Sequence, residues 1–488
     1  MIQEFYKKIF TNLNSNKIFY KYNNAEYKYS DIKKVYISLL ALLSLIKNKN
    51  KIILVISNKS FEFYATSISI ILSGNTWVPI SSKAPAELIK KNITVLKPYL
   101  ILFDKKNFII QKDIKKFIKK NKINFEIIED LQKYRKNKIK LKKNITINKD
   151  DVAMIFFTSG STGEGKAVAI SHKNYITSLT SQIERLYQKK NNLIFADFHD
   201  SSFVIILNIL FPCIYTKSII CPAIETTDIL FPIDHIKRNK INTLITVPSY
   251  FNQIKTSLKK NIKFNNLILC GEPFYLDLLK FIIKNKLATN IYNCYGSTEL
   301  SPWVFSHECK KEDLKKFNKF GLVPIGKKFD FVKKKIINEE LYISGDSVVK
   351  GYLNNKLNKE KFLKISGKTY FKTSDIVKEI NGISLVKGRN DRIAKISGHR
   401  VDITEIEMAL KKITNFKNCF AFTQNISEYE KIICAAIEGS SSKKEFVELN
   451  LKKILPTYMY PKKIIFMKQF PLNKNFKIDR LKIIQSFN

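Results

Sequence analysis

The residues best suited to chemistry form one segment rich in glycine and hydroxyl groups, Phe157 to Lys166. Glycine is scarce in the 488-residue chain, which holds 15, yet three of them fall within six positions of this segment. Glycines let backbone N–H groups approach a ligand closely, and four hydroxyls and one lysine add donors suited to a triphosphate. An apolar run, Val152 to Phe157, leads into the segment. The pattern predicts a strand followed by a phosphate-binding loop rather than a flexible connection.

This loop differs from the one found in P-loop NTPases. The spacing of Gly160 and Gly165-Lys166 matches their pattern, but the next residue is Ala167. The hydroxyl that holds magnesium in those enzymes is therefore missing. We expect a different class of phosphate loop.

The loop sequence, TSGSTGEGK, resembles that of the adenylate-forming (AMP-binding) superfamily, which includes acyl-CoA synthetases, luciferases and nonribosomal-peptide adenylation domains. Other segments resemble further motifs of the family, in the family's order, over nearly the whole chain. They are residues 29–32, 73–80, 293–299, 340–352, 370–375, 388–402, 455–459 and 475–480. Four of the seven arginines lie in these segments although the chain strongly favours lysine. Arginine is expected where a planar bidentate donor grips ribose or phosphate.

The resemblance implies a site for ATP and Mg²⁺, with Tyr295 stacked on adenine and Asn293 bonded to its edge. Asp375 would accept the ribose hydroxyls beside Arg389, and Glu299 would hold the metal. The implied ATP-binding residues are Thr158, Ser159, Gly160, Ser161, Thr162, Gly163, Gly271, Glu272, Asn293, Cys294, Tyr295, Gly296, Ser297, Asp375 and Arg389. The implied catalytic residues are Lys166, Thr298 on the α-phosphate, and Lys477, which would bridge that phosphate and the substrate carboxylate.

Two positions depart from the family's pattern. Ser374 and Phe476 stand where the family has glycine. A side chain at Phe476 restricts the backbone that delivers Lys477. These departures predict either slow activity or a loss of activity.

The implied substrate is an amino acid, because Phe198-His199-Asp200-Ser201-Ser202-Phe203 resembles a stretch of the amino-acid-activating members. Asp200 would pair with the substrate ammonium, a charge that fatty and aryl acids lack. Asp197 is a competing candidate, and Asp200 could instead cap a helix. The implied side-chain pocket includes Val204, Cys270, Pro302 and Trp303 and suits a small neutral amino acid.

The elements that must position these residues alternate between strand and helix through the first 330 residues. Buried strands are predicted at 51–57, 99–103, 243–247 and 266–270, with helices at 35–46, 86–96 and 276–284. Such alternation predicts βαβ units and parallel sheets. From Leu341 short strands with turns follow, then a small α+β unit with helices near 404 and 444–455 and strands at 431–438 and 462–467.

The predicted fold class is α/β, with a large N-terminal domain of doubly wound sheets and a small barrel-like part, 1–387, and a small mobile α+β domain, 393–488. A hinge at 388–392 joins them, and by resemblance Asp391 is its pivot. A polar hinge residue can be solvated in both conformations.

Charge alone favours another class of protein. The formal net charge is +43, which suits a nucleic-acid partner. However, 78 of the 85 basic residues are lysines, scattered along the chain together with abundant Asn, Ile, Phe and Tyr. These residues share AT-rich codons, so base composition explains the charge and no nucleic-acid partner is expected. The seven cysteines form no CxxC pair, and no apolar run is long enough for membrane insertion, so a cytoplasmic protein is expected.

The function implied is ATP-dependent activation of an amino acid to aminoacyl-AMP, followed by transfer to a phosphopantetheine thiol. The chain leaves no room for a carrier domain, so the carrier protein is expected in trans and supplies the phosphopantetheine. This resembles free-standing adenylation enzymes of peptide synthetases and D-alanine–carrier-protein ligases. The alternative is an acyl-CoA synthetase, which shares the first step but uses coenzyme A as acceptor.

Overall fold

The first sheet carries the expected phosphate loop between two of its strands. The computed structural model describes residues 2–45, 50–136, 147–158, 166–187, 192–259, 262–353, 358–390, 393–414, 418–440, 444–471 and 478–487. Thr158 and Lys166 are register partners on adjacent strands, so the sheet holds both ends of the segment 159–165, which lies outside the described residues. In order across the sheet, the strands are β6 (Asn124–Ile127), β5 (Leu100–Phe103), β3 (Ile52–Ile56), β4 (Thr76–Ile80), β7 (Val152–Thr158) and β8 (Lys166–Ser171).

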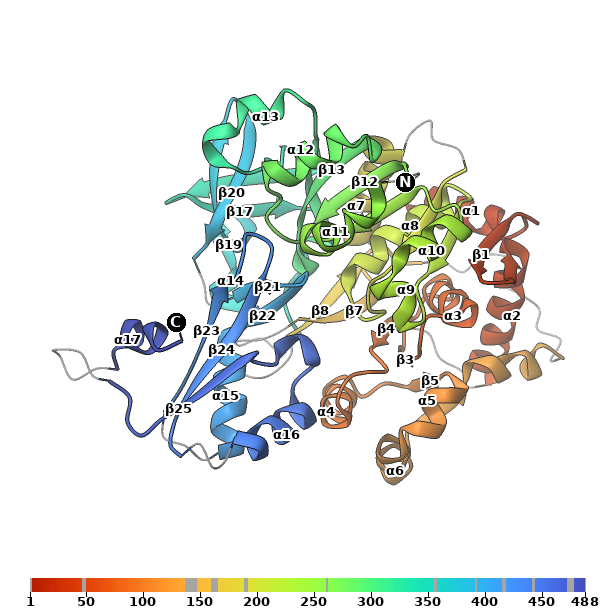
Figure 1. Ribbon diagram of the computed structural model, residues 1–488. Coiled ribbons are helices and arrows are strands. Elements are labelled where there is room, and N and C mark those ends of the chain that lie inside the picture. The colour runs from red at the N-terminus through yellow and green to blue at the C-terminus, as the bar shows by residue number, and fades with distance from the viewer. Residues whose placement is uncertain are drawn as a thin grey trace.

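The second sheet has nine strands, and its parallel central strands end at one edge (Figure 1). Carboxyl ends of parallel strands meet at the same edge, which is where open α/β sheets bind ligands. That edge brings together the residues that follow Asp197, Thr246, Cys270 and Gly296. In order the strands are β15 (Lys327–Lys328), β14 (Trp303–Glu308), β13 (Ala288–Gly296), β12 (Phe264–Cys270), β11 (Thr243–Thr246), β9 (Ile194–Asp197), β10 (Ile219–Pro222), β1 (Ile18–Tyr22) and β2 (Ala25–Lys28).

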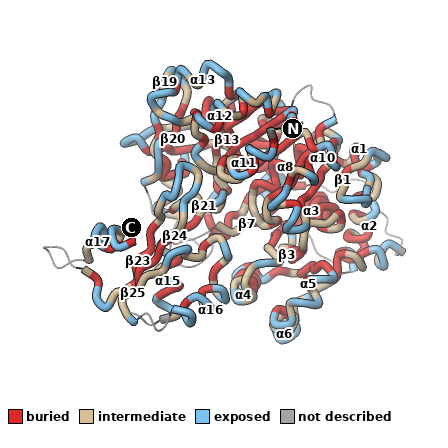
Figure 2. The backbone as a smooth tube through the Cα atoms, in the orientation of Figure 1, coloured by how far each residue is buried: buried red, intermediate tan, exposed pale blue. Residues whose placement is uncertain are grey.

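Helices cover both sheets, and Figure 2 shows the buried backbone running through their centre. The central strands are largely apolar, as parallel strands buried on both faces require. Trp77 of β4 meets Phe156 of β7 edge to face at 5.8 Å, within the large cluster that joins the two sheets. The helices are α1 (Ile2–Asn12), α2 (Tyr29–Leu45), α3 (Phe61–Leu72), α4 (Ala86–Leu96), α5 (Lys105–Ile110), α6 (Lys112–Lys120), α7 (His172–Gln182), α8 (Leu207–Tyr215), α9 (Thr226–Leu230), α10 (Pro232–Arg238), α11 (Pro248–Ile254), α12 (Leu276–Lys284) and α13 (Asp313–Lys316).

A third, antiparallel sheet of five strands corresponds to the expected barrel-like part. Its long strand β19 carries Asp375 directly opposite Arg389 of β20. The sheet thereby presents a carboxylate and a guanidinium side by side. Its elements are β16 (Val332–Ile337), β17 (Glu340–Gly345), α14 (Asn358–Lys361), β18 (Phe362–Ile365), β19 (Lys368–Ile380) and β20 (Ile383–Arg389).

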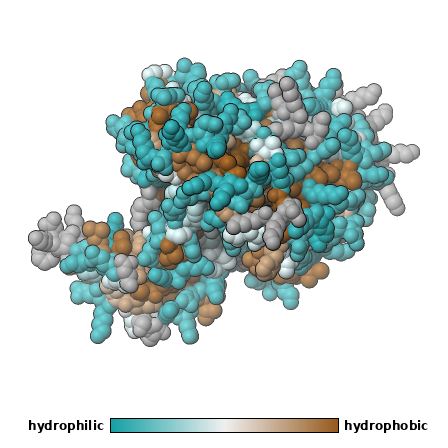
Figure 3. All heavy atoms as spheres, turned by 45° about the horizontal axis from the view of Figure 1, so that its top comes forward, coloured by the Kyte–Doolittle hydropathy of each residue, from teal (hydrophilic) through white to brown (hydrophobic). Residues whose placement is uncertain are grey.

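The C-terminal residues form a smaller lobe, separated from the larger by a waist in the space-filling view (Figure 3). Two clusters of apolar side chains fill it, one around Val401 and Ile406 and the other around Phe420 and Ile483. Its elements are the hairpin β21 (Ile393–Ile396) and β22 (His399–Asp402), then α15 (Ile403–Thr414), β23 (Cys419–Asn425), β24 (Lys431–Glu438), α16 (Lys444–Ile454), β25 (Lys463–Met467) and α17 (Arg480–Gln485).

The sequence pattern assigned bounds to a minority of these elements, and most of those bounds are close. Helices α4 and α12 and strand β24 have the predicted bounds, and the other predicted strands differ by one or two residues. Helix α2 begins at Tyr29, six residues before the predicted start at Val35. Many elements were not individually predicted, among them the hairpin β21–β22 within a polar segment, β23 and the short α17. None of the described helices is both long and apolar enough to cross a bilayer.

A substitution at Gly296, the last residue of β13, tests how closely β13 approaches the backbone of Pro302. A Cβ there would lie 1.8 Å from the carbonyl oxygen of Pro302, a backbone atom that cannot move aside. We expect Gly296→Ala to lower the free energy of unfolding by at least about 2 kcal/mol. Thermal melting measures the effect, and Gly388→Ala is the control, since nothing lies within 4 Å of a Cβ at Gly388. Equal melting temperatures for the two variants would contradict the close approach.

Candidate active site

Two neighbouring cavities lie at the carboxyl edge of the nine-stranded sheet. Their volumes are about 330 and 590 Å³, and Gly271, Asp375, Arg389 and Lys395 line both. The smaller cavity is walled by the two large sheets and by residues of the C-terminal lobe. The larger reaches from the end of β13 to β23 and α17. Both lobes therefore contribute residues to the walls of both cavities.

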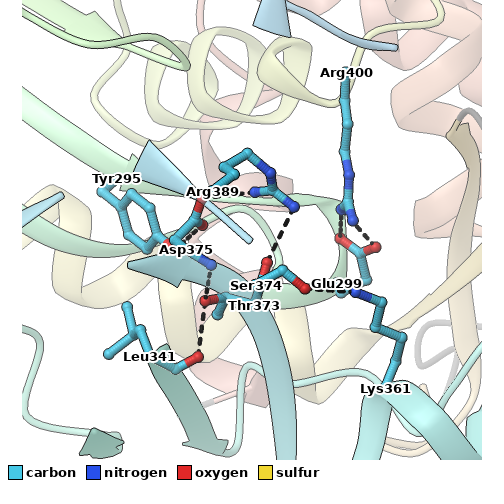
Figure 4. Close-up of polar contacts among 9 residues, drawn as sticks. All are labelled: Tyr295, Glu299, Leu341, Lys361, Thr373, Ser374, Asp375, Arg389 and Arg400. Carbon is cyan, nitrogen blue, oxygen red and sulfur yellow. Dashed lines mark hydrogen bonds and ion pairs between the residues drawn. The ribbon is translucent and has the colours of Figure 1, made fainter. Parts of the chain in front are cut away.

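Asp375 is the centre of a buried polar cluster between the two cavities (Figure 4). Arg389 Nη1 donates to its Oδ1 at 2.6 Å, and the Tyr295 hydroxyl donates to its Oδ2. The Thr373 hydroxyl accepts from the Asp375 backbone N–H at 3.1 Å and donates to the Leu341 carbonyl at 2.8 Å. Burial and the Asp375 charge raise the pKa of Tyr295 well above its usual value, so its hydroxyl remains a donor. This arrangement orients the carboxylate on the cavity wall.

The backbone of Ser374, the residue before Asp375, has a conformation that favours glycine. Its φ is +63°, a left-handed conformation that costs a residue with a side chain of the order of 1–3 kcal/mol. The Ser374 hydroxyl accepts a hydrogen bond from Lys361 Nζ at 2.7 Å. The departure is thus accommodated without displacing Asp375.

The larger cavity brings together Asn293 and Tyr295, which are expected around adenine, and Gly271, Glu272 and Cys294, which are expected to bind ATP. Asn293 Nδ2 already donates to the carbonyls of Val323 and Pro324, at 3.2 and 2.9 Å. The Asn293 amide therefore holds the neighbouring loop as well as lining the cavity.

Glu272 has partners on both lobes. Its carboxylate accepts the backbone N–H of Ser249 at 3.0 Å and that of Gly398 at 2.5 Å. Gly398 has a φ of +80°, and a Cβ there would lie 2.6 Å from Val247. In this arrangement Glu272 holds the β21–β22 hairpin rather than facing a ligand alone.

The phosphate end of the smaller cavity is lined by Thr158, Gly296, Ser297 and Thr298. The Thr158 hydroxyl is buried and has no hydrogen-bond partner among the described residues, as expected of a group that awaits a ligand. Lys166 is 5% exposed, and burial together with the Arg400 charge lowers its pKa. The remaining loop residues expected to bind phosphate, Ser159 to Gly163, lie outside the described residues.

Glu299 is fully buried and ion-paired with Arg400 of the hairpin (Figure 4). Arg400 Nη1 donates to both carboxylate oxygens, at 2.8 and 3.1 Å, and the Tyr352 hydroxyl donates to Oε1 at 2.7 Å. Burial alone would raise the pKa of Glu299, but the Arg400 charge and the Tyr352 hydrogen bond outweigh it and lower the pKa to about 2. The position therefore fits a cation, although no group of three His, Cys, Asp or Glu gathers around a metal position within the described residues.

Asp200 lies on the wall of the smaller cavity together with Val204, Cys270, Pro302 and Trp303, as expected. Its carboxylate accepts from the Ser81 hydroxyl at 2.7 Å, the Ser202 N–H at 2.9 Å and the Ser202 hydroxyl at 2.7 Å. An ionised carboxylate offers about four acceptor sites, so one remains for an ammonium. Asp200 thus both caps the following turn and faces the cavity.

Asp197, the competing candidate, is turned into the protein. It is 1% exposed, accepts from the Tyr64 hydroxyl at 2.6 Å and pairs with Lys59 at 3.8 Å. It is not among the described residues that line either cavity. The structure therefore favours Asp200 as the residue that meets a ligand.

The hairpin of the C-terminal lobe supplies site residues that the sequence analysis did not assign. Lys395, His399 and Arg400 all line the smaller cavity. The His399 ring stacks on Tyr458 at 3.8 Å, and its pKa is lowered to about 4, mainly by burial. All three residues fall in the segment 388–402, whose resemblance to a family motif was the available signal.

Two expected site residues, Lys477 and Asp391, lie outside the described residues. The flank of Lys477 is described: Ile478 packs against the cluster around Phe420, and the Asp479 N–H donates to the Pro471 carbonyl at 2.7 Å. The roles expected for both residues remain predictions.

Known proteins resemble both the sequence and the fold. The family model described as AMP-binding enzyme matches residues 14–353. The D-alanine–D-alanyl carrier protein ligase of Lactococcus lactis subsp. lactis is 26% identical over 451 residues, which cover 89% of this chain and 88% of the relative.

Two solved structures share the fold. The Vibrio cholerae adenylation domain AlmE, in complex with glycyl-adenosine-5'-phosphate, has a TM-score of 0.83 at 20% identity and covers 99% of this chain and 98% of its own. The o-succinylbenzoate CoA synthetase of Bacillus subtilis has a TM-score of 0.82 at 17% identity, with 98% of each chain covered. An adenylation domain and a CoA synthetase therefore share one architecture with this chain.

The Glu299–Arg400 pair predicts a specific pH dependence of stability. Because the folded pKa is about 2 and the unfolded value is 4.5, the ionised carboxylate stabilises the fold above pH 4.5. That contribution disappears as the pH falls from 4.5 towards 2. Glu299→Gln should lose about 3–5 kcal/mol at neutral pH, because Arg400 is left without its charged partner. Its stability should also vary less with pH in the acid range than that of the wild type, because the glutamine does not titrate.

Denaturant unfolding from about pH 7 to about pH 3 measures both effects, since that range spans most of the expected change. Glu448→Gln is the control, because Glu448 is exposed on α16. Parallel pH profiles for wild type and Glu299→Gln would contradict the depressed pKa of Glu299.

Proposed function

The chain belongs to the AMP-binding enzyme family, and from that premise we propose that it activates an amino acid with ATP and transfers it to a carrier protein. An oxygen of the amino-acid carboxylate attacks the α-phosphorus, and pyrophosphate leaves, which gives an aminoacyl-AMP. The thiolate of a carrier-bound phosphopantetheine then attacks the acyl carbon, and AMP leaves. The observation that carries the proposal is the cavity shared by Asp200, Thr298 and Asp375.

The described residues suit each part of ATP. Asp375, held by Arg389 and Tyr295, presents acceptors where ribose hydroxyls would lie. The Thr158 hydroxyl, which has no hydrogen-bond partner among the described residues, and the buried Lys166 lie at the two ends of the expected phosphate loop. Donors fixed in advance stabilise charge that develops on the phosphate, because they need no reorganisation during the reaction.

Mg²⁺ would be held by Glu299, where it supplies positive charge to the phosphates. In the structure that carboxylate is occupied by Arg400, which belongs to the other lobe. A cation held by Glu299 would compete with the Arg400 guanidinium for that carboxylate. We infer that the adenylation step takes place with the hairpin withdrawn from Glu299.

This competition supports a division into two moving parts. We propose that residues 1–387 form the AMP-binding domain, 388–392 the hinge around Asp391, and 393–488 the mobile domain. β20 ends at Arg389 and β21 begins at Ile393, so the proposed pivot, Asp391, lies between these two strands. The described arrangement, with Lys395, His399 and Arg400 in the cavity, would serve the thiol-transfer step, and Lys477 would enter for adenylation.

The proposed contact between Asp200 and the substrate ammonium distinguishes an amino-acid substrate from other carboxylic acids. Asp200 lies on the cavity wall with one acceptor site left, and an acyl-CoA synthetase substrate would leave that charge unpaired. The lactococcal relative is named for D-alanine and a carrier protein. An amino acid, a carrier in trans and a cytoplasmic location are therefore proposed, with coenzyme A as the alternative acceptor.

Lys477 tests the adenylation step. We expect Lys477→Ala to reduce amino-acid-dependent ATP–pyrophosphate exchange at least about 100-fold, because it removes the cation that bridges carboxylate and α-phosphate. ATP binding and transfer from a preformed adenylate should change little. Lys468→Ala is the control, since Lys468 is an exposed lysine of the same lobe. Normal exchange in Lys477→Ala would remove Lys477 from the proposed mechanism.

Asp200 tests the substrate class. Removal of its charge leaves the ammonium unpaired, and breaking a buried pair costs about 3–5 kcal/mol, a factor of several hundred to several thousand. Asp200→Asn should raise the KM for the amino acid by that order, while the KM for ATP stays constant. Asp113→Asn, at an exposed site on α6, is the control.

Pyrophosphate exchange with the amino acid and with its des-amino acid measures both constants. A wild type that prefers the des-amino acid would support the acyl-CoA synthetase alternative instead.

A further inference from the structure

Asn208 is a buried amide on the wall of the smaller cavity that the proposed mechanism does not use. It is the second residue of α8 and is 1% exposed. Neither its Nδ2 nor its Oδ1 has a hydrogen-bond partner among the described residues. Buried side-chain polar atoms in native proteins are nearly always paired, so one that is not needs a reason.

The residues next to Asn208 on α8 are apolar, so packing of the helix does not explain an amide at this position. Leu207, Ile209 and Leu210 are completely buried and apolar. A leucine at position 208 would match them in size and avoid the cost of two unpaired groups. The amide is therefore best explained by something that occupies the cavity.

Asn208 lines the same cavity as the residues expected to surround the amino-acid side chain. Val204 lines it four residues earlier, a spacing that places two side chains on one face of a helical turn. Pro302, Trp303, Cys270 and Asp200 line this cavity as well. An amino acid with its ammonium at Asp200 would therefore have its side chain within the cavity that Asn208 lines.

We propose that Asn208 recognises the substrate side chain, and that the substrate carries a neutral group that both donates and accepts hydrogen bonds. A hydroxyl or a carboxamide can accept from Nδ2 and donate to Oδ1 at once. An ammonium only donates, a carboxylate only accepts, and a methyl does neither, so each leaves part of the amide unpaired. This inference rests on the proposed amino-acid activation and specifies the class of amino acid.

Pairs of nearly isosteric substrates test the inference on the wild-type enzyme. Serine is compared with 2-aminobutyrate, threonine with valine and asparagine with leucine, each as both enantiomers, in ATP–pyrophosphate exchange. We expect kcat/KM to favour the polar member of one pair by roughly 10- to 100-fold, the effect of leaving a buried group unpaired. The serine and asparagine arms distinguish a hydroxyl from a carboxamide.

The variant Asn208→Leu removes the amide and nearly keeps its volume. Its preference for the polar member should fall to about one, with an unchanged KM for ATP. The apo variant should melt no lower than the wild type, because an unpaired buried amide is replaced by an apolar side chain. Ile209→Val is the matched control: Ile209 is the buried neighbour of Asn208 on α8 and is not among the described residues that line either cavity, so the preference should persist.

The outcomes separate this inference from the proposed function. Exchange with amino acids but without preference for a polar member of any pair overturns the role of Asn208, which would then be satisfied by a buried water, and leaves amino-acid activation standing. A preference that survives in Asn208→Leu overturns it as well. Exchange with no amino acid, but with des-amino acids, overturns the proposed function itself.

Discussion

The contact between Glu299 and Arg400 is the interaction on which the arrangement of the site depends. A fully buried carboxylate remains ionised only if a cation lies beside it, because burial strongly disfavours an isolated charge. Glu299 belongs to the large lobe and Arg400 to the hairpin of the small lobe. The pair therefore holds the two lobes in contact. Under the proposed mechanism, Mg²⁺ at Glu299 would compete with Arg400, and metal binding would then depend on the position of the small lobe.

The parallel sheet determines where these charges can be placed. Strands β9, β11, β12 and β13 end together, so the segments after them bring Asp200, Gly271 and Thr298 to one cavity. The antiparallel sheet adds Asp375 opposite Arg389. Because these positions are set by strand register rather than by flexible loops, two anions can be held close enough to react.

The polar groups of the site differ in whether they have hydrogen-bond partners within the described part of the protein. Asp375 and Glu299 have their partners within the protein and are oriented before a ligand arrives. The Thr158 hydroxyl and the Asn208 amide have none among the described residues. The first kind preorganises the site, and the second kind is expected to distinguish between ligands, since an unpaired buried group penalises a ligand that cannot complement it.

The sequence by itself determined the elements with the clearest patterns and singled out the candidate site residues. Strands such as Val152 to Thr158 follow from continuous apolar runs, and helix α12 from its apolar periodicity. The expected phosphate loop is a prediction from clustered glycines, and Asp375 and Arg389 are candidates from motifs. These are local signals, because each depends only on neighbouring residues.

Tertiary structure decided which of these residues meet. The sequence left Asp197 and Asp200 as alternatives, and only the packing of Tyr64 and Lys59 against Asp197 separates them. The pairing of Glu299 with Arg400 joins residues 101 positions apart, and Asn208 gains significance only because its helix is buried against a cavity. Contacts between distant residues depend on how sheets and lobes pack, and no local pattern in the chain encodes that packing.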